Sequence, residues 1–294
     1  MTTAPAVPPT TSAVDCARYE RDGYLVLEQA FTGSEVAALN DELVRLVRGE
    51  LGPVAGSAVG PDADEEQALA ATLCVHFPHK LSALYATAMR HPRVVDALVQ
   101  LLSPDVKCMQ SMAFVKSEGK PGQAWHQDEQ FIPTRDRSLT AAWIALDDAT
   151  VHNGCLWALP GSHRPGVLYP QREQQDARFD CTMEAHRFPY REQDAVALEV
   201  RAGDVVVFNG YLLHRSLPNS GGHGLRRALV HHYMNASSLL PWVPQDGVTI
   251  GMTDFRDVVL VAGTDPYDWQ PPSELSRVEV RPDGRGGCLP PQER

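Results

Sequence analysis

Residues 124–128 read Ala-Trp-His-Gln-Asp, so that one residue separates His126 from Asp128. In an extended segment the side chains of residues i and i+2 point to the same side, and these two side chains would therefore face one point. The stretch lies among short β-type runs that are separated by Gly, Pro and Asn. These runs are 106–116, 140–147, 196–200, 204–208 and 228–234. We predict a β core over about 105–236, with His126 and Asp128 on one of its walls.

An imidazole nitrogen and a carboxylate oxygen aimed at one point are two ligands of a metal site. A third ligand from another strand would complete one face of an octahedron and leave three positions open, which is the two-His-one-carboxylate arrangement of Fe(II) oxygenases. The best third ligand is His214, because it follows a strand-turn signal and precedes another β-type run. We predict that His126, Asp128 and His214 bind Fe(II), with open positions for a chelating co-substrate and O2.

Arg226 follows His214 by twelve residues and precedes the β-type run 228–234 by two, so it could lie on the next strand. An arginine there could form a bidentate pair with the distal carboxylate of 2-oxoglutarate, while the keto acid's other end chelates the metal. The Ser216 hydroxyl could add a hydrogen bond to the same carboxylate. These residue types together predict a 2-oxoglutarate site beside the metal.

The first hundred residues carry helical patterns. Residues 24–27 look like a short strand, and a helix then opens at Thr32-Gly33-Ser34 with apolar Val36, Leu39, Leu43 and Leu46 at the 3.6-residue period. A second helical region spans about 81–102 and is interrupted near His91-Pro92. We expect loops at 52–66 and at 161–195, the latter lying over a mouth. Helices followed by strands predict an α+β chain with a β barrel or sandwich on helical supports.

Composition narrows the class of protein. A chain of 294 residues could form one large domain or two modest ones. Its formal net charge of −11 argues against non-specific binding of nucleic acid. No run of residues approaches the roughly 20 apolar residues that are needed to cross a bilayer. Six scattered cysteines without a C-x-x-C pair indicate reduced thiols, and thus a soluble cytoplasmic protein. We expect a disordered tail at 1–12; the oligomeric state is not predicted.

A longer set of motifs gives the chain a family resemblance. It resembles the phytanoyl-CoA dioxygenase family of Fe(II)/2-oxoglutarate oxygenases, which includes ectoine hydroxylase. The residues that carry this resemblance, in chain order, are Gln110-Ser111, Lys116, Trp125-His126-Gln127-Asp128, 140–148, Asn153-Gly154-Cys155-Leu156, Pro160-Gly161-Ser162-His163, Gly203-Asp204, His214-x-Ser216-x-x-Asn219 and Arg226-Arg227-Ala228. The match spans roughly residues 20–270. A co-ordered set of this length is far more specific than a lone His-x-Asp.

The resemblance implies a fold and a set of ligands. The expected fold is mainly β, a double-stranded β-helix (jelly roll) with flanking N-terminal helices in a single domain over 13–294. The resemblance implies iron on the three predicted ligands, and 2-oxoglutarate held by Arg226 and Ser216 with help from Gln110 and Trp143. The gap between His214 and the basic pair is one residue longer than is usual in the family. Arg227 therefore stays as the alternative to Arg226.

The resemblance also implies an activity. Members of this family use Fe(II), 2-oxoglutarate and O2 to oxidise a C–H bond, and they release succinate and CO2. Related halogenases replace the metal-binding carboxylate with a small residue, so the retained Asp128 favours hydroxylation, with desaturation or ring formation as alternatives. The residues after the His-x-Asp, 129–133, do not reproduce the signature of ectoine hydroxylase. We expect another small-molecule substrate.

Other residues near these motifs have plainer interpretations. His231 and His232 alternate faces in a strand and cannot both face one site, so we expect a structural role for the pair. His76 and His79 lack a fourth ligand at zinc-like spacing. Lys116 could hold a substrate carboxylate or lie on the surface of a strand. Phe131 and Tyr211 flank the predicted ligands and are candidate pocket walls.

Two functions from other classes remain as alternatives. A jelly-roll binding or sensor protein would keep the metal cage without turnover. A cupin-type isomerase or hydrolase would work with Zn or Mn and would need neither O2 nor 2-oxoglutarate. Release of succinate from 2-oxoglutarate under air, with and without Fe(II), separates these alternatives from the oxygenase.

Overall fold

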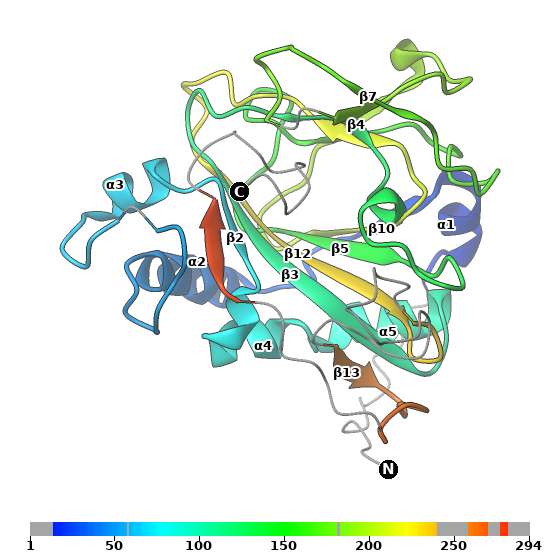
Figure 1. The fold of residues 1–294 in the computed structure, drawn as a ribbon, viewed down its shortest axis with the longest axis horizontal. Helices are drawn as coiled ribbons and strands as arrows, with labels where there is room; N and C mark the ends of the chain where they lie inside the picture. The colour runs from blue at the N-terminus through cyan, green and yellow to red at the C-terminus, as the bar shows by residue number, and fades with distance from the viewer. Residues whose placement is uncertain (1–13, 58, 181–182, 240–257, 270–276, 282–294) are drawn as a thin grey trace, which may run out of the picture.

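A computed structural model describes residues 14–57, 59–180, 183–239, 258–269 and 277–281. Figure 1 shows three layers in this part of the chain: helices on one side, a large β-sheet in the middle and a smaller sheet on the other side. The expected tail at 1–12 lies outside the described residues. No helix among the described residues has both the length and the apolar character needed to span a membrane.

The large sheet is antiparallel throughout. Its strands, in spatial order, are β1 (Tyr24–Leu27), β10 (Val205–Asn209), β5 (Thr140–Ala145), β12 (Arg226–Asn235), β3 (Val106–Lys116), β2 (Cys74–His76) and β14 (Glu279–Arg281), and β13 (Val259–Ala262) also pairs with β3. The predicted runs supply its centre. Strands β1, β2, β13 and β14 lie outside the predicted core of 105–236, and they extend the sheet at its edges.

The small sheet is built from short strands. Their order is β4 (Gln123–His126), β11 (His214–Ser216), β6 (Leu156–Ala158) and β9 (Val196–Leu198), all antiparallel. A separate pair joins β7 (Gln171–Glu173) to β8 (Met183–Ala185). The 3-10 turns among the described residues are η1 (Pro78–Lys80), η2 (Asp128–Gln130) and η3 (Glu192–Asp194).

Alternating side chains fill the space between the two sheets. On β5, Ala141 and Trp143 belong to an apolar cluster with Val230 of β12, and Leu156 and Ala158 of the small sheet complete that cluster. Their neighbours Ala142 and Ile144 belong to a different cluster, because successive residues of a strand face opposite sides. Two antiparallel sheets packed face to face confirm the expected mainly β, jelly-roll architecture.

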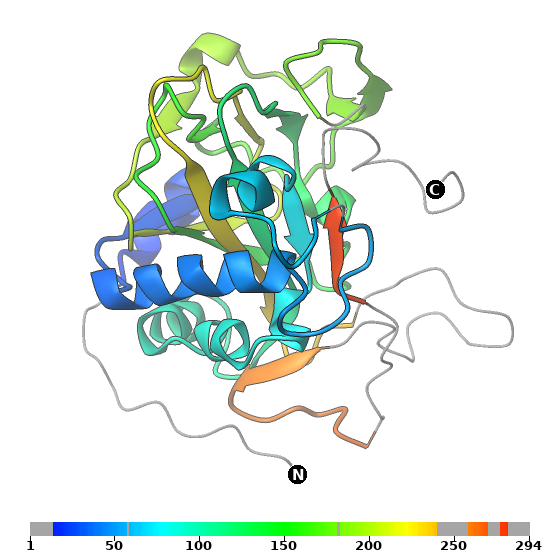
Figure 2. The same ribbon diagram turned by 90° about the vertical axis from the view of Figure 1, so that its left-hand side faces the viewer.

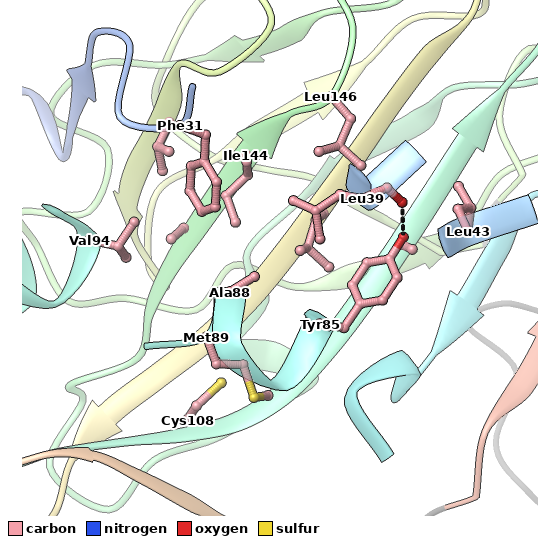
Figure 3. Close-up of a cluster of buried hydrophobic side chains, with 14 of the residues drawn as sticks. Phe31, Leu39, Leu43, Tyr85, Ala88, Met89, Val94, Cys108, Ile144 and Leu146 are labelled. Carbon is pink, nitrogen blue, oxygen red and sulfur yellow. Dashed lines mark hydrogen bonds between the residues drawn. The ribbon is translucent and has the colours of Figure 1, made fainter. Parts of the chain in front are cut away.

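Helices cover the other face of the large sheet. These helices are α1 (Cys16–Asp22), α2 (Gly33–Val47), α3 (Glu65–Ala70), α4 (Ala83–Ala88) and α5 (Pro92–Leu101), and Figure 2 shows α2 running along the sheet. Leu39 and Leu43 of α2 pack in one cluster with Ile144 of β5 (Figure 3). In the same cluster, the Tyr85 hydroxyl donates a hydrogen bond of 2.9 Å to the carbonyl of Leu39. The helices therefore bury this face of the large sheet.

The helix signals in the sequence are confirmed. Thr32 caps α2, and its side chain and that of Glu35 each bond the other's backbone amide, which is a capping box. The predicted second helical region divides into α4 and α5, and Pro92 begins α5 because its missing N–H is not needed there. The expected loop at 52–66 ends two residues earlier than predicted, at Asp64, which caps α3.

The segment 161–195 does not lie where we expected it. None of its described residues lines the main cavity; instead, Tyr169 and Ala185 pack with Trp125 on the outer face of the small sheet. Trp125 alternates with His126 along β4, so it points away from the cavity and offers an apolar surface there. This contact fixes the segment behind β4.

Candidate metal centre and its cavity

His126 ends β4, and the chain stays extended through Gln127 to Asp128. Gln127 has φ −130° and ψ 127°, and η2 begins at Asp128. The side chains on either side of Gln127 therefore point the same way, as the sequence predicted. The stretch is held between the sheets, and His126 and Asp128 are both buried.

His214 begins β11, the strand that pairs with β4. In the antiparallel register its Cα lies directly opposite that of His126. Residues directly opposite on paired strands carry their side chains on the same face, so the two imidazoles meet. Their ring centroids are 4.1 Å apart. Strand pairing thus brings together two predicted ligands that are far apart in the sequence.

The ligand atoms converge. Nε2 of His126 and Nε2 of His214 each lie 3.6 Å from Oδ1 of Asp128, and one atom from each residue lies within 4.8 Å of the others. Both Nδ1 atoms face away and donate to backbone carbonyls, that of Ala124 at 2.8 Å and that of Leu212 at 3.0 Å. With the proton on Nδ1, each Nε2 offers its lone pair to a shared point, as a metal-binding histidine must.

The electrostatics of the cluster suit a cation. Burial, together with nearby His214, lowers the pKa of His126 from 6.5 to about 4, so its imidazole is neutral at pH 7. Burial alone would raise the pKa of Asp128, but His214 and His232 outweigh it and hold that pKa well below its usual value. Asp128 is an anion at neutral pH. The three side chains together present one negative charge and two lone pairs.

The cluster opens into a cavity of about 190 Å³ between the two sheets. Its lining includes all seven residues that were predicted to bind the metal or 2-oxoglutarate: His126, Asp128, His214, Gln110, Trp143, Ser216 and Arg226. The rest of the lining is His76, Met112, Phe114, Gln123, Phe131, Ile132, Leu156, Phe208, Val230, His232 and Arg281. Apolar side chains form most of the wall, and the formally charged side chains in the lining are Asp128, Arg226 and Arg281.

Arg226 and Arg227 begin β12 and point to opposite faces of the large sheet. Arg226 lies in the cavity, is 3% exposed, and its Nε has no hydrogen-bond partner among the described residues. Its guanidinium lies 5.5 Å from the centre of the Trp143 ring. Arg227 instead forms a two-bond ion pair with Asp147, at 2.9 and 2.8 Å. Of the two alternatives, Arg226 is the one that faces the cavity.

Lys116 is the Cα partner of Arg226 on β3, and it too is buried. Its ammonium donates to the Ser216 hydroxyl at 3.0 Å and to the carbonyl of Leu217 at 2.7 Å. Burial, and then repulsion from Arg226, lowers the pKa of Lys116 well below its usual value. The alternative of a surface lysine is therefore wrong. Ser216 and Arg226 line the cavity, Lys116 contacts Ser216 from outside that lining, and we call these three residues the basic corner.

The sequence places this arrangement in a known family. A profile of the phytanoyl-CoA dioxygenase (PhyH) family matches residues 19–228. Phytanoyl-CoA dioxygenase 1 of Oryza sativa subsp. japonica is 32% identical over 247 residues, which cover 72% of this chain and 86% of the rice protein. The chain belongs to the PhyH family.

Solved structures resemble the PhyH-family chain in fold. The non-heme monooxygenase ThoJ, in its apo form, superposes with a TM-score of 0.64 at 21% identity, over 91% of this chain and 88% of ThoJ. CytC3 with Fe(II) and alpha-ketoglutarate superposes with a TM-score of 0.59 at 22% identity, over 88% of this chain and 91% of CytC3. Both likenesses agree with the jelly-roll architecture.

One residue that lines the PhyH-family site was not expected there. His232 lies in the cavity, and its Nε2 is 3.2 Å from Oδ2 of Asp128. His231 points to the other face of β12, where its Nδ1 contacts the Tyr233 hydroxyl at 3.1 Å. The two histidines do face opposite sides, but a structural role for both was too broad a prediction. The signal was available, since Arg226 and His232 are both even-numbered positions of one strand.

Of the other residues considered in the sequence analysis, some line the cavity and some do not. Phe131 lines the cavity as expected, whereas Tyr211 does not; its ring lies beside Arg137, and its carbonyl accepts a hydrogen bond from Gln127. His76 reaches the cavity wall but lies outside the ligand cluster. His79 contacts the Ser111 hydroxyl at 2.6 Å, away from the site.

Proposed function

We propose that this PhyH-family protein is an Fe(II)- and 2-oxoglutarate-dependent dioxygenase that hydroxylates a C–H bond of a small organic molecule. The observation that carries the proposal is the convergence of His126, Asp128 and His214 on the wall of a cavity that also holds Arg226. CytC3, which shares the fold, is a protein with Fe(II) and alpha-ketoglutarate. The family's dioxygenases supply the reaction class.

The donor set fits a ferrous ion. Two neutral imidazole nitrogens and one carboxylate oxygen form the mixed nitrogen–oxygen face that non-haem Fe(II) prefers. With metal–ligand bonds of roughly 2.1 Å, ligands at right angles lie about 3 Å apart. The observed separations of 3.6 Å need only small side-chain adjustments to reach that geometry. His126, Asp128 and His214 would hold the metal.

The basic corner fits the distal carboxylate of 2-oxoglutarate. Arg226 keeps its charge at neutral pH, because burial lowers its pKa only to about 10. A guanidinium pairs with a carboxylate through two parallel hydrogen bonds, and the Ser216 hydroxyl adds a donor beside it. Trp143 restricts the guanidinium from one side. Gln110 lies on the cavity wall and would complete the binding site of the co-substrate.

Bound together, Fe(II), 2-oxoglutarate and O2 supply the oxidation of a C–H bond, with release of succinate and CO2. The chain's own part is to position the reactants and to exclude water. The three ligands are buried, and each histidine is fixed through its Nδ1 proton. Met112, Phe114, Phe131 and Ile132 form an apolar wall, against which we place an apolar portion of the substrate.

The test measures succinate. The purified protein is incubated with Fe(II) and 2-oxoglutarate under air, with a library of small molecules, and products are checked by mass spectrometry for the gain of one oxygen atom. We expect succinate release that requires Fe(II), 2-oxoglutarate and O2, and that rises with a substrate. Asp128→Ala serves as the control that lacks a ligand, and it should release none.

Two outcomes would overturn the proposal. Tight binding of Fe(II) and 2-oxoglutarate without succinate release, with every compound of the library, would favour a sensor. Conversion of a library compound with Zn or Mn, in the absence of O2 and 2-oxoglutarate, would favour an isomerase or hydrolase of the cupin type.

A further inference from the structure

The two oxygens of Asp128 face different partners. Oδ1 points to the ligand cluster, where it lies 3.6 Å from the Nε2 atoms of His126 and His214. Oδ2 lies 3.2 Å from Nε2 of His232. The carboxylate is therefore held from both ends, with one oxygen turned to the metal-binding point and the other turned to a histidine outside the ligand set.

The direction of this hydrogen bond is fixed by chemistry. An ionised carboxylate can only accept, so Nε2 of His232 must carry the proton and donate it. Nδ1 of His232 is buried and has no partner among the described residues, so no competing contact turns the ring away. His232 is 5% exposed and comes from β12 of the large sheet, whereas Asp128 follows β4 of the small sheet. The bond spans the cavity from one sheet to the other.

A carboxylate can bind a metal through one oxygen or through both. The proposed function, on which this inference rests, needs three open positions: two for the chelating keto acid and one for O2. A second oxygen of Asp128 on the metal would remove one of them. A residue that holds Oδ2 away from the metal therefore keeps a coordination position free for 2-oxoglutarate or O2.

We propose that His232 is a positioning residue that restrains Asp128 to single-oxygen binding. By donating to Oδ2 from the opposite sheet, it orients the carboxylate so that Oδ1 alone faces the metal. His126 and His214 are oriented by the backbone carbonyls of Ala124 and Leu212, and His232 does for the carboxylate what those carbonyls do for the imidazoles. Partners of this kind typically change metal affinity 10- to 100-fold when removed, so roughly that loss is expected here.

The test compares variants that keep or remove the donor. His232→Phe keeps a ring of similar size but removes the N–H, while His232→Gln returns an N–H donor at similar reach. His231→Phe is the matched control, because His231 is also a buried histidine of β12 but faces the other side. Fe(II) affinity and 2-oxoglutarate binding are measured without O2, the latter through the visible absorption of the Fe(II)–keto acid chelate, and a thermal melt reports folding of each variant.

We expect His232→Phe to bind Fe(II) about 10- to 100-fold more weakly, and to chelate 2-oxoglutarate more weakly still. His232→Gln should recover most of both, and His231→Phe should change stability but not affinity. Should His232→Phe fail to fold, His232→Leu takes its place. Equal Fe(II) and 2-oxoglutarate binding in the wild type and in a folded variant without the donor would overturn the inference.

A second measurement needs no variant. In a crystal of the wild-type protein grown with Fe(II) under anaerobic conditions, we expect Oδ1 alone on the metal and Oδ2 on His232. Two Asp128 oxygens on the metal would refute the positioning role while leaving the proposed function intact. A wild-type protein that binds no Fe(II) at all would instead refute the proposed function, and this inference with it.

Discussion

At the scale of single residues, strand alternation turns two adjacent arginines to opposite faces of β12. Arg226 faces the cavity, and Arg227 faces Asp147 on the other side of β12. Both are largely buried, and they differ in what surrounds them. This neighbouring pair is a natural matched control.

Replacing each arginine by methionine should separate binding from stability. Hydrogen bonds to charged groups contribute about 1.5–3 kcal/mol, so Arg226→Met should raise the apparent Kd for 2-oxoglutarate about 10- to 100-fold with Fe(II) binding retained. Arg227→Met should leave that Kd unchanged and lower the free energy of unfolding, because Asp147 loses its ion pair. Anaerobic 2-oxoglutarate titration and urea unfolding measure the two effects. The reverse pattern would mean that Arg227 holds the keto acid.

His231 should make the fold sensitive to acid. Burial, with nearby His79 and His232, lowers its pKa from 6.5 to about 3 in the folded protein. Below pH 6.5 the unfolded chain binds a proton that the folded protein refuses, so stability is lost as the pH falls from about 6.5 towards 3. At pH 5 the loss is on the order of 2 kcal/mol for this residue.

Urea unfolding at pH 7 and at pH 5 tests this expectation. The wild type should be less stable at pH 5, and His231→Gln should lose part of that pH dependence because glutamine does not titrate. His79, whose pKa burial lowers to about 4, supplies a further part in both proteins. An identical pH dependence in wild type and variant would show that His231 is not the group responsible.

The sequence pointed to the main polar residues of the cavity, but not to the residue that holds one of them in place. His126, Asp128, His214 and Arg226 could be nominated because a metal site and a carboxylate site demand particular residue types at strand spacing. His232 was missed because its role depends on the distance between two sheets, which no local spacing reveals. Its place on the cavity face, by contrast, was legible from the alternation of β12.

At the scale of elements, the site depends on strands too short to be recognised alone. Strands β11 and β6 have three residues each and lack the apolar runs that predicted β3, β5, β10 and β12. They are strands because β4 and β9 pair with them, and that pairing is a property of the fold. The ends of β4 and β11 carry His126 and His214, so contacts that hold these strand ends in place also hold the proposed metal ligands.

Gln127 makes such contacts, and it lies between His126 of β4 and Asp128 of η2. It is fully buried; its amide donates to the carbonyls of Tyr211 at 2.7 Å and Val167 at 2.9 Å, and its oxygen accepts from the amide of Tyr169 at 2.9 Å. One side chain thereby joins β4, the segment before β11 and the long segment behind the small sheet.

Gln127→Glu should destabilise the protein strongly although it changes one atom. The new carboxylate oxygen would face two carbonyl oxygens, which lose their donor and meet a negative charge. We expect a loss of about 3 kcal/mol in the free energy of unfolding, together with weaker Fe(II) binding. Gln130→Glu, at an exposed position three residues on, is the control and should change little. If Gln127→Glu and Gln130→Glu both unfolded at the same urea concentration as the wild type, the expected role of Gln127 would be wrong.

At the scale of the whole molecule, both halves of the chain reach the large sheet. Strand β1 pairs at one edge and β14 at the other, although the two lie far apart in the sequence (Figure 1). The sequence predicted helices, a β core and their order along the chain. It did not predict that β12 lies between β5 and β3, or that β14 joins the edge, because such pairings depend on contacts between distant segments.

The edge strand β14 also reaches the site. Arg281 lines the cavity and donates to Asp180 at 2.9 Å, and the two side chains are 11% and 3% exposed. Burial raises the pKa of Asp180, and Arg281 opposes that rise. The pair therefore links β14, at the end of the described chain, to the segment 161–195.

Replacing one member of the Arg281–Asp180 pair should lower the free energy of unfolding more than replacing both members together. Arg281→Met or Asp180→Leu alone leaves a buried charge without its partner, and we expect each to lose about 3 kcal/mol of unfolding free energy. The double variant should lose clearly less than the sum of the two, because neither charge remains. Urea unfolding of all four proteins gives the coupling energy directly. Single variants that unfold like the wild type would mean that the pair does not hold this edge of the sheet in place.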